Sequence, residues 1–130
     1  MDRTFVEEEI ASQPRTWGDA ARLAPSVAAA LPAAGERVAF VGCGTSWFVA
    51  MSAAVRRESA GLGESDAFAA SEFPAGRTYD RVVAISRSGT TTEVIELLAG
   101  IDAPTTLITA VGDSPRHRAR RRDDHARVRR

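Results

Sequence analysis

Arg37-Val-Ala-Phe-Val41 is a short β-prone run, and it ends in the glycine-rich turn Gly42-Cys-Gly-Thr-Ser46. The same arrangement returns farther along the chain, where Arg81-Val-Val-Ala-Ile85 leads into Ser86-Arg-Ser-Gly-Thr-Thr91. The second run is apolar without alternation, as is typical of a parallel strand that is covered on both faces. A helical pattern follows each turn, so the order of strands and helices predicts an α/β layered fold with right-handed crossovers.

The remaining segments in the middle of the chain fit this alternation. From Ser46 to about Ser59 the helical period places on one face the residues Phe48, Met51, Ser52 and Val55. A weaker strand is predicted over 66–70 and a last strand over 105–111. The stretch Thr90-Thr-Thr-Glu93 resembles a capping box that opens a helix, with the inward residues Val94, Ile95, Leu98 and Ile101. The predicted fold class is a three-layer α/β/α sandwich with a parallel sheet, incomplete at the C-terminus.

The N-terminal segment, residues 1–34, is predicted to be helical. Its alanine-rich composition favours helix, and its apolar residues recur at the helical period. We expect Pro14 to end a first helix, Thr16 to cap a second, and Pro25 to break that second stretch. The predicted organisation is a helical segment over 1–34, a partial α/β domain over 35–114 and a tail over 115–130.

All 17 basic residues among the 130 are Arg, and the formal net charge of zero hides an asymmetry. Eight Arg lie in 116–130, so that stretch carries a charge of +6 while residues 1–115 carry −6. The single cysteine, Cys43, excludes an internal disulfide and favours a reducing compartment. No apolar run reaches the ~18–20 residues of a membrane span, and the acidic N-terminus is unlike a signal peptide. We expect a cytoplasmic protein without a metal site, since two His and one Cys are too few ligands.

The Arg-rich tail has too few apolar residues to cover a sheet, and we expect it to be disordered. The composition changes abruptly where this tail begins. The use of Arg and no Lys throughout the chain, together with abundant Ala, is typical of a GC-rich gene. One hypothesis is that residues from about 116 onward are an out-of-frame translation, or that the gene is a truncated remnant. The rival hypothesis is an arm that binds nucleic acid through its clustered Arg. The lack of interleaved aromatic residues and the acidic body argue against nucleic acid as a partner.

Both glycine-rich turns suit an anionic ligand. Each follows a predicted parallel strand, at the end where open α/β sheets bind ligands, and each leads into a helix N-terminus, which attracts anions. Glycine lets the backbone approach a ligand, while Ser and Thr add hydroxyl groups without charge, so a phosphorylated ligand with several hydroxyl groups fits. The alternative is an ordinary connection in which Ser and Thr only cap the helix. Neither turn matches a nucleotide fingerprint, because G-x-G-x-x-G is absent and the chain has no Lys.

The turn Gly42-Cys-Gly-Thr-Ser46 and the stretch Ile85-Ser-Arg-Ser-Gly-Thr-Thr-Thr-Glu93 together resemble the sugar isomerase (SIS) domain family. The likeness is to the isomerase half of glucosamine-6-phosphate synthase and to its relatives that lack a glutaminase domain. Glu8-Glu-Ile-Ala-Ser-Gln-Pro14 is similar to the family's opening E-I-x-x-Q-P segment, and Ala70-Ser-Glu-Phe73 is similar to the end of its second strand. These four landmarks occur in the family's order and cover roughly residues 6–112.

The resemblance implies which residues contact a phosphosugar. Carried over position by position, they are Gly44, Thr45, Ser46, Ser86, Arg87, Ser88, Gly89 and Thr91. The first turn would contact the sugar, and the second would hold the phosphate through hydroxyl and backbone N–H groups. Arg87 stands where the synthase often has Gln, so its guanidinium either pairs with the phosphate or points into solvent.

The resemblance also implies an incomplete catalytic apparatus. Family isomerases contain two SIS domains, and their catalytic base, ring-opening His and Schiff-base Lys come from the second domain or the C-terminal tail. Isomerisation needs a positioned acid or base. The sequence assigns no catalytic residue and no cofactor, so we expect no isomerase activity from this chain by itself.

The expected function is therefore the binding of a phosphorylated sugar or aminosugar, by a domain of phosphosugar isomerase or deaminase lineage that pairs as a homodimer. One alternative is a phosphosugar-sensing module of a transcriptional regulator, although the short helices over 4–31 lack the turn of a helix-turn-helix domain. The other alternative is an inactive truncated remnant.

Overall fold

Within the described residues, 4–111 and 127–128, five parallel strands form one sheet in the computed structural model. The strands are β1 (Val38–Gly42), β2 (Ser65–Ala69), β3 (Arg81–Ile85), β4 (Thr105–Ile108) and β5 (Arg127–Val128). Their order across the sheet is β2-β1-β3-β4-β5, and every neighbouring pair is parallel. The predicted α/β class and parallel sheet are confirmed, although β4 ends three residues before the predicted strand.

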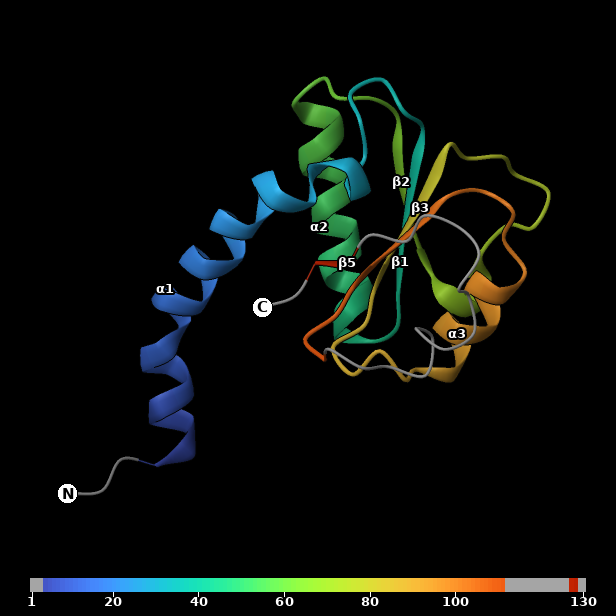
Figure 1. Ribbon diagram of the computed structural model, residues 1–130. Helices are drawn as coiled ribbons and strands as arrows, with labels where there is room; N and C mark the ends of the chain where they lie inside the picture. Colours follow the sequence, from blue (N-terminus) through green and yellow to red (C-terminus); the bar gives the residue numbers. More distant parts are fainter. Residues whose placement is uncertain (1–3, 112–126, 129–130) are drawn as a thin grey trace.

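Among the described residues, helices cover both faces of the sheet (Figure 1). Helix α2 (Thr45–Ser59) lies on one face, and helix α3 (Thr92–Ala99) lies on the other. The interior strand β1 is buried along its whole length and sends alternate residues into two apolar cores. Val38 and Phe40 pack on the α2 side, whereas Val41 packs on the α3 side, with Val94 and Leu98. The predicted three-layer arrangement is therefore present.

The face of α2 that meets the sheet carries small residues. Ala50 and Ala54 are buried against β1 and β3. The large apolar residues that the helical period placed together lie on the opposite face, where Phe48, Met51 and Val55 are exposed. Small side chains bring a helix backbone close to a sheet, so the alanines set a short distance between the two layers.

Gly42 extends this close approach to the beginning of α2. A Cβ atom added at Gly42 would lie 2.6 Å from the backbone carbonyl carbon of Ser46 and 2.8 Å from the backbone nitrogen of Trp47. Real Cβ atoms do not come so near to backbone atoms, so only glycine permits this packing. The first turn of α2 therefore rests directly on the end of β1.

The N-terminal helix α1 (Phe5–Leu23) is continuous, so the predicted break at Pro14 and the predicted cap at Thr16 are wrong. Thr4 caps the helix instead, in a capping box in which its hydroxyl accepts a hydrogen bond of 3.3 Å from the Glu7 N–H. Pro14 removes one helical hydrogen bond. The helix has no buried residue, so water can reach the carbonyl that the proline leaves without its donor.

The second proline does change the helix, as predicted. Beyond α1 the chain forms the 3-10 helix η1 (Ala24–Ala30), with Pro25 in its first turn, where a missing N–H costs no helical bond. The carbonyl of Ala30 accepts hydrogen bonds from Thr106 Oγ1 and Arg81 Nη1, which attach η1 to β3 and β4. No helix in the described part of the chain is long and apolar enough to cross a membrane.

A buried arginine ties the C-terminal end of α2 to its surroundings. Arg57 is only 9% exposed. Its guanidinium donates to the carbonyl oxygens of Ala33 and Leu62, both at 2.8 Å, and to Ser65 Oγ at 2.9 Å. A planar group with five donors can satisfy several acceptors at once. Arg57 thereby joins the loop before β1, the loop after α2 and the first residue of β2.

Most of the Arg-rich tail lies outside the described residues. The predictions made for it, namely disorder, an out-of-frame translation or an arm that binds nucleic acid, therefore concern residues outside the described part of the chain. Arg127 and Val128 are the exception, because their backbone pairs with Leu107 and Ile108 of β4 as strand β5. The sequence predicted no strand there, since a charged segment has little apolar surface to bury. Strand pairing, however, uses backbone groups that nearly every residue type carries.

Replacing Gly42 with Ala tests the close approach of α2 to β1. The added Cβ would collide with backbone atoms that cannot move aside, so we expect Gly42→Ala to lower the free energy of unfolding by about 1–3 kcal/mol. Chemical denaturation followed by circular dichroism measures the change. Gly76→Ala is the control, because nothing lies within 4 Å of its Cβ position. A Gly42→Ala protein as stable as the control would contradict the described packing.

Replacing Arg57 with Met tests the buried hydrogen bonds at the end of α2. Methionine keeps much of the side-chain length but removes the three hydrogen bonds to Ala33, Leu62 and Ser65, so we expect a loss of about 2–4 kcal/mol in unfolding free energy. Arg56→Met is the matched control, because Arg56 is the exposed neighbour on the same helix. The same denaturation assay applies, and equal stability of the two variants would show that these bonds contribute little.

Candidate functional site

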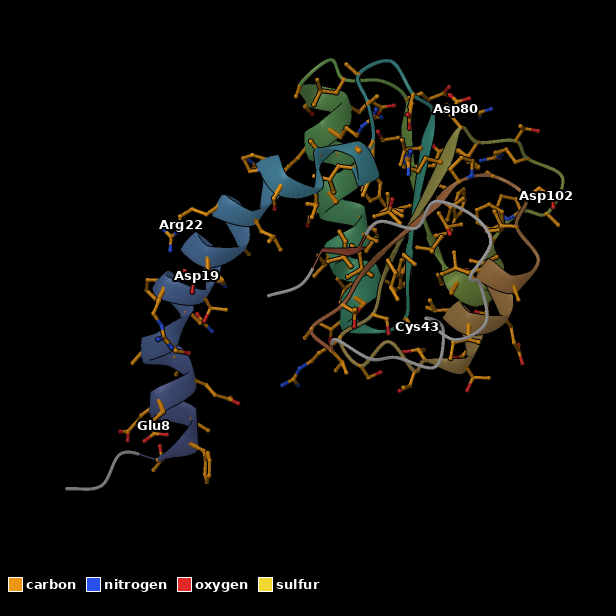
Figure 2. All side chains as sticks on the ribbon, viewed as in Figure 1. Glu8, Asp19, Arg22, Cys43, Asp80 and Asp102 are labelled. Carbon is orange, nitrogen blue, oxygen red and sulfur yellow. The ribbon has the colours of Figure 1, made fainter. Side chains whose placement is uncertain are left out.

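The two glycine-rich turns leave the sheet at the same edge. β1 and β3 are adjacent and parallel, with Val38 paired to Arg81 and Val41 paired to Ala84. The turn after β1 and the turn after β3 therefore emerge side by side at the carboxyl ends of the strands. Cys43, in the first turn, marks this edge in Figure 2, and Asp80, just before β3, marks the opposite edge. We call the edge formed by residues 42–46 and 86–91 the carboxyl rim.

The chain reverses direction across the sheet between β1 and β3. From β1 it crosses through α2 to β2, on one side, and from β3 it crosses through α3 to β4, on the other side. The two helices consequently cover opposite faces (Figure 1). Open α/β sheets bind ligands at such a reversal point, because the two turns that flank it separate and leave a crevice between them.

The first turn presents the N-terminus of α2 to the rim. Gly44 precedes the helix with φ 56° and ψ −125°, a left-handed conformation that favours glycine. Thr45 begins the helix and is exposed, and Ser46 is half-buried with its N–H bonded to the Cys43 carbonyl at 3.1 Å. No side chain caps α2, and its first turn has no acidic residue. The positive end of the helix dipole is thus left open toward the rim.

In the second turn, two hydroxyl groups hold the loop together. Ser86 is 2% exposed, and its Oγ accepts a hydrogen bond of 3.1 Å from the Gly89 N–H. The same Oγ lies 3.0 Å from Thr91 Oγ1, at hydrogen-bond distance. Gly89 has φ 67°, the left-handed conformation that this bend requires. Ser86 and Thr91 therefore shape the turn from inside.

The predicted capping box Thr90-Thr-Thr-Glu93 is wrong, because α3 begins one residue later than it requires and the Thr90 hydroxyl donates to Ser88 Oγ instead. Thr91 is the N-cap residue, but its side chain makes no capping hydrogen bond. Glu93, exposed, is the acidic residue of the first turn of α3. Like α2, α3 thus points a helix N-terminus without a side-chain cap at the carboxyl rim.

Arg87 and Ser88 are the exposed members of the second turn. The Ser88 Oγ accepts hydrogen bonds from the Thr90 N–H at 3.2 Å and from Thr90 Oγ1 at 2.9 Å, so it keeps its own proton for an external acceptor. The Arg87 carbonyl accepts from the Ala110 N–H at 3.1 Å. The backbone of Arg87 is fixed in this way, while its side chain extends from the surface.

Thr109 also supports the second turn, although no sequence motif pointed to it. This buried residue follows β4, and its Oγ1 donates to the Arg87 carbonyl at 3.1 Å, which links the second turn to the next strand. The sequence placed Thr109 inside a strand over 105–111, so its hydroxyl had no assigned role. The available signal was a hydroxyl residue directly after the apolar pair Leu107-Ile108, the same sequence of residue types as at Ser86.

A cavity of about 480 Å³ lies elsewhere, at the amino ends of β3 and β4, between α3 and the loop before β3. Phe73, Tyr79 and Leu97 supply much of its apolar lining. Burial raises the pKa of Tyr79, and so does its hydrogen bond to Asp66, in which the Tyr79 hydroxyl donates at 2.6 Å. None of the residues predicted to bind a ligand lines this cavity.

Comparisons with known proteins agree on one fold. No family model matches the chain, and no curated protein matches it. Among solved structures, the tagatose-6-phosphate ketose/aldose isomerase of Escherichia coli has a TM-score of 0.72 at 21% identity, over 96% of this chain and 40% of that one. The glucosamine-6-phosphate deaminase of Thermotoga maritima has a TM-score of 0.53 at 28% identity, and the match covers 63% of this chain and 28% of the deaminase chain.

A third structure is that of the NanR protein of Vibrio vulnificus complexed with ManNAc-6P. It has a TM-score of 0.55 at 26% identity, over 84% of this chain and 41% of that one. This chain therefore spans less than half the length of each of the three structures. The predicted resemblance is confirmed: the described part of the chain has the fold of a sugar isomerase (SIS) domain.

Proposed function

We propose that this chain binds a phosphorylated sugar or aminosugar at the carboxyl rim. The observation that carries the proposal is the meeting of two hydroxyl-bearing turns at the reversal point between β1 and β3. Two helix N-termini without side-chain caps point at this rim and favour an anion. The hydroxyl groups beside them suit the polar ring of a sugar.

The phosphate is assigned to the second turn. Its ligands would be the Ser88 hydroxyl and the N-terminus of α3, since the N–H groups of Gly89 and Thr90 are engaged with Ser86 and Ser88 within the turn. Ser86 and Thr91, whose hydroxyl groups are engaged with each other, contribute by holding the turn in shape. The exposed Arg87 is assigned to the phosphate as well, since a guanidinium pairs with phosphate through two parallel hydrogen bonds.

The sugar ring is assigned to the first turn. Thr45 and Ser46 offer hydroxyl groups, and Gly44 offers backbone without a side chain in the way. Proton transfer between adjacent sugar carbons would need a positioned acid or base, and the sequence assigns none. The proposal is therefore binding by a domain of isomerase or deaminase lineage, with no turnover by this chain alone. The free Cys43 fits a reducing compartment, so we place the chain in the cytoplasm.

A sensing module is the second candidate function. It is favoured by the likeness to the Vibrio vulnificus NanR protein, whose structure was solved with ManNAc-6P. The two candidates share the ligand class, and neither predicts conversion of the ligand by this chain alone. NMR of a sugar phosphate incubated with the chain checks this point: both candidates expect unchanged spectra, and any conversion would contradict both.

A thermal-shift titration with glucosamine 6-phosphate and fructose 6-phosphate tests the binding proposal. A ligand present at ten times its Kd stabilises the folded form by about 1.4 kcal/mol, which raises the Tm by several degrees in a domain of this size. We expect a rise with at least one of the two sugar phosphates and none with unphosphorylated glucosamine. If neither compound shifts the Tm at millimolar concentration, the proposal fails.

Replacing Arg87 with Ala tests the phosphate contact. Loss of a charge-assisted hydrogen bond should weaken binding of the sugar phosphate by about 10- to 100-fold, measured by isothermal titration calorimetry. Arg15→Ala is the control, because Arg15 is an exposed arginine on α1, remote from the rim. Equal affinity of the two variants would mean that the Arg87 side chain points into solvent.

A further inference from the structure

Thr109 binds the second turn to the strand beside it. This residue follows β4 directly and is buried, with 5% of its surface exposed. Its Oγ1 donates a hydrogen bond of 3.1 Å to the Arg87 carbonyl and accepts one of 3.3 Å from the Val111 N–H. Because the hydroxyl group has both a donor and an acceptor in fixed directions, it is held in one orientation.

The carbonyl oxygen of Arg87 receives two hydrogen bonds at once. The second donor is the Ala110 N–H, at 3.1 Å. A carbonyl oxygen has two lone pairs, and two donors fix its direction more closely than one donor does. One residue earlier, the Ser86 N–H donates to the Ile108 carbonyl at 3.0 Å. The beginning of the second turn is therefore bound to the end of β4 at two consecutive residues.

The direction of this carbonyl determines the direction of the next backbone N–H. The peptide group is planar, and no peptide bond in the described residues is cis. The Arg87 C=O and the Ser88 N–H belong to one trans peptide group, so they point in opposite directions. The carbonyl points at the end of β4, and the Ser88 N–H consequently points away from it. Across β3 from β4 lies β1, which carries the first turn.

The Ser88 N–H has no acceptor within the described residues. Its neighbours differ, because the Gly89 N–H donates to Ser86 Oγ and the Thr90 N–H donates to Ser88 Oγ. Ser88 is exposed, so a ligand can reach its N–H from outside. The second turn thus leaves one backbone donor open, and it is the donor whose direction the bonds at the Arg87 carbonyl determine.

We propose that Thr109 is a positioning residue of the phosphate site. By holding the Arg87 carbonyl, it aims the Ser88 N–H at the ligand, so that Ser88 offers a phosphate oxygen both its hydroxyl and its backbone N–H. The inference rests on the phosphate assignment of the proposed function, and it adds a residue that does not touch the ligand. A donor that is already ordered loses little entropy when the phosphate arrives, so the residue that orders it affects affinity.

Thr109→Val separates the hydroxyl group from the shape of the side chain. Valine keeps the branched shape of threonine but removes the bond to the Arg87 carbonyl and leaves the Val111 N–H without its acceptor. The carbonyl then keeps a single donor, and its peptide group can tilt. We expect the Kd of the sugar phosphate to rise about 10-fold, as measured by isothermal titration calorimetry. Thr109→Ser restores the hydroxyl group and should bind as wild type does.

Thr106→Val is the matched control for a loss of stability. Thr106 is completely buried in β4, and its hydroxyl donates to the Ala30 carbonyl of η1, not to the second turn. This variant should lower the Tm, as Thr109→Val does, but leave the affinity unchanged. Circular dichroism verifies that each variant is folded at the temperature of the titration. If Thr109 served stability alone, the two valine variants would behave alike in both measurements.

The backbone amide signal of Ser88 reports on the proposed contact directly. Glucosamine 6-phosphate and fructose 6-phosphate are titrated into protein whose serines carry ¹⁵N, and the signal that Ser88→Ala lacks is followed by NMR. A hydrogen bond to phosphate should move the amide proton downfield in wild type and in Thr109→Ser. The movement should be smaller in Thr109→Val, because its peptide group is no longer held.

The outcomes separate this inference from the proposed function. If wild type binds neither sugar phosphate, the proposed function fails and the role of Thr109 fails with it. If wild type binds but Thr109→Val binds equally well, the binding proposal stands and only the role of Thr109 is overturned. The same conclusion holds if the ligand binds to wild type without moving the Ser88 amide signal. Weaker binding by Thr109→Val, recovery in Thr109→Ser and unchanged binding by Thr106→Val together support the inference.

Discussion

The parallel pairing of β1 with β3 is the constraint on which the rest of the molecule depends. These two strands are neighbours in the sheet although α2 and β2 lie between them in the sequence. The chain therefore has to leave β1 toward one side of the sheet and leave β3 toward the other. Because crossovers between parallel strands are right-handed, α2 and α3 must then lie on opposite faces. The two glycine-rich turns are brought to one rim by the same pairing.

In helix α2, close packing against the sheet also determines which side chains remain on the surface. Its alanines and the neighbouring Gly42 bring the backbone of the helix close to the sheet, where larger side chains would not fit. The large apolar residues of the helix are consequently left on the outside. Burying them within the same domain would require a wider gap between helix and sheet, and hence a different position for the first turn. The geometry of the rim and the apolar outer surface therefore have a common cause.

The hydroxyl groups in and beside the second turn divide into two kinds. Those of the buried Ser86 and Thr109 and the half-buried Thr91 make hydrogen bonds that stabilise the loop. Ser88 is exposed and bonded only to its neighbour Thr90. A phosphate site benefits from both kinds, because a rigid loop has already ordered the groups that meet the ligand and loses less entropy on binding.

Much of this molecule could be predicted from local patterns. Strand β3, a continuous apolar run, and the two turns of the rim are visible in the amino-acid order, because hydrogen-bonding and helical or strand periodicity act over a few residues. The motif pair also indicated the fold family. Local rules were less successful at two places. At Pro14 the helix continues through the proline, and at the start of α3 the hydroxyl of Thr90 bonds to Ser88 instead of capping the helix.

Other properties arose only when distant segments came together. The order of the amino acids placed Phe48 and Val55 on one face of a helix, but it did not show that this face would point outward. That orientation depends on how near the helix backbone comes to the sheet, which is governed by Gly42 at the end of a separate strand. In the same way, the role of Ser86 depends on the position of Thr91 across the turn. Periodicity describes which residues share a face, whereas three-dimensional packing selects the face that is buried, because the fit between two surfaces involves both of them.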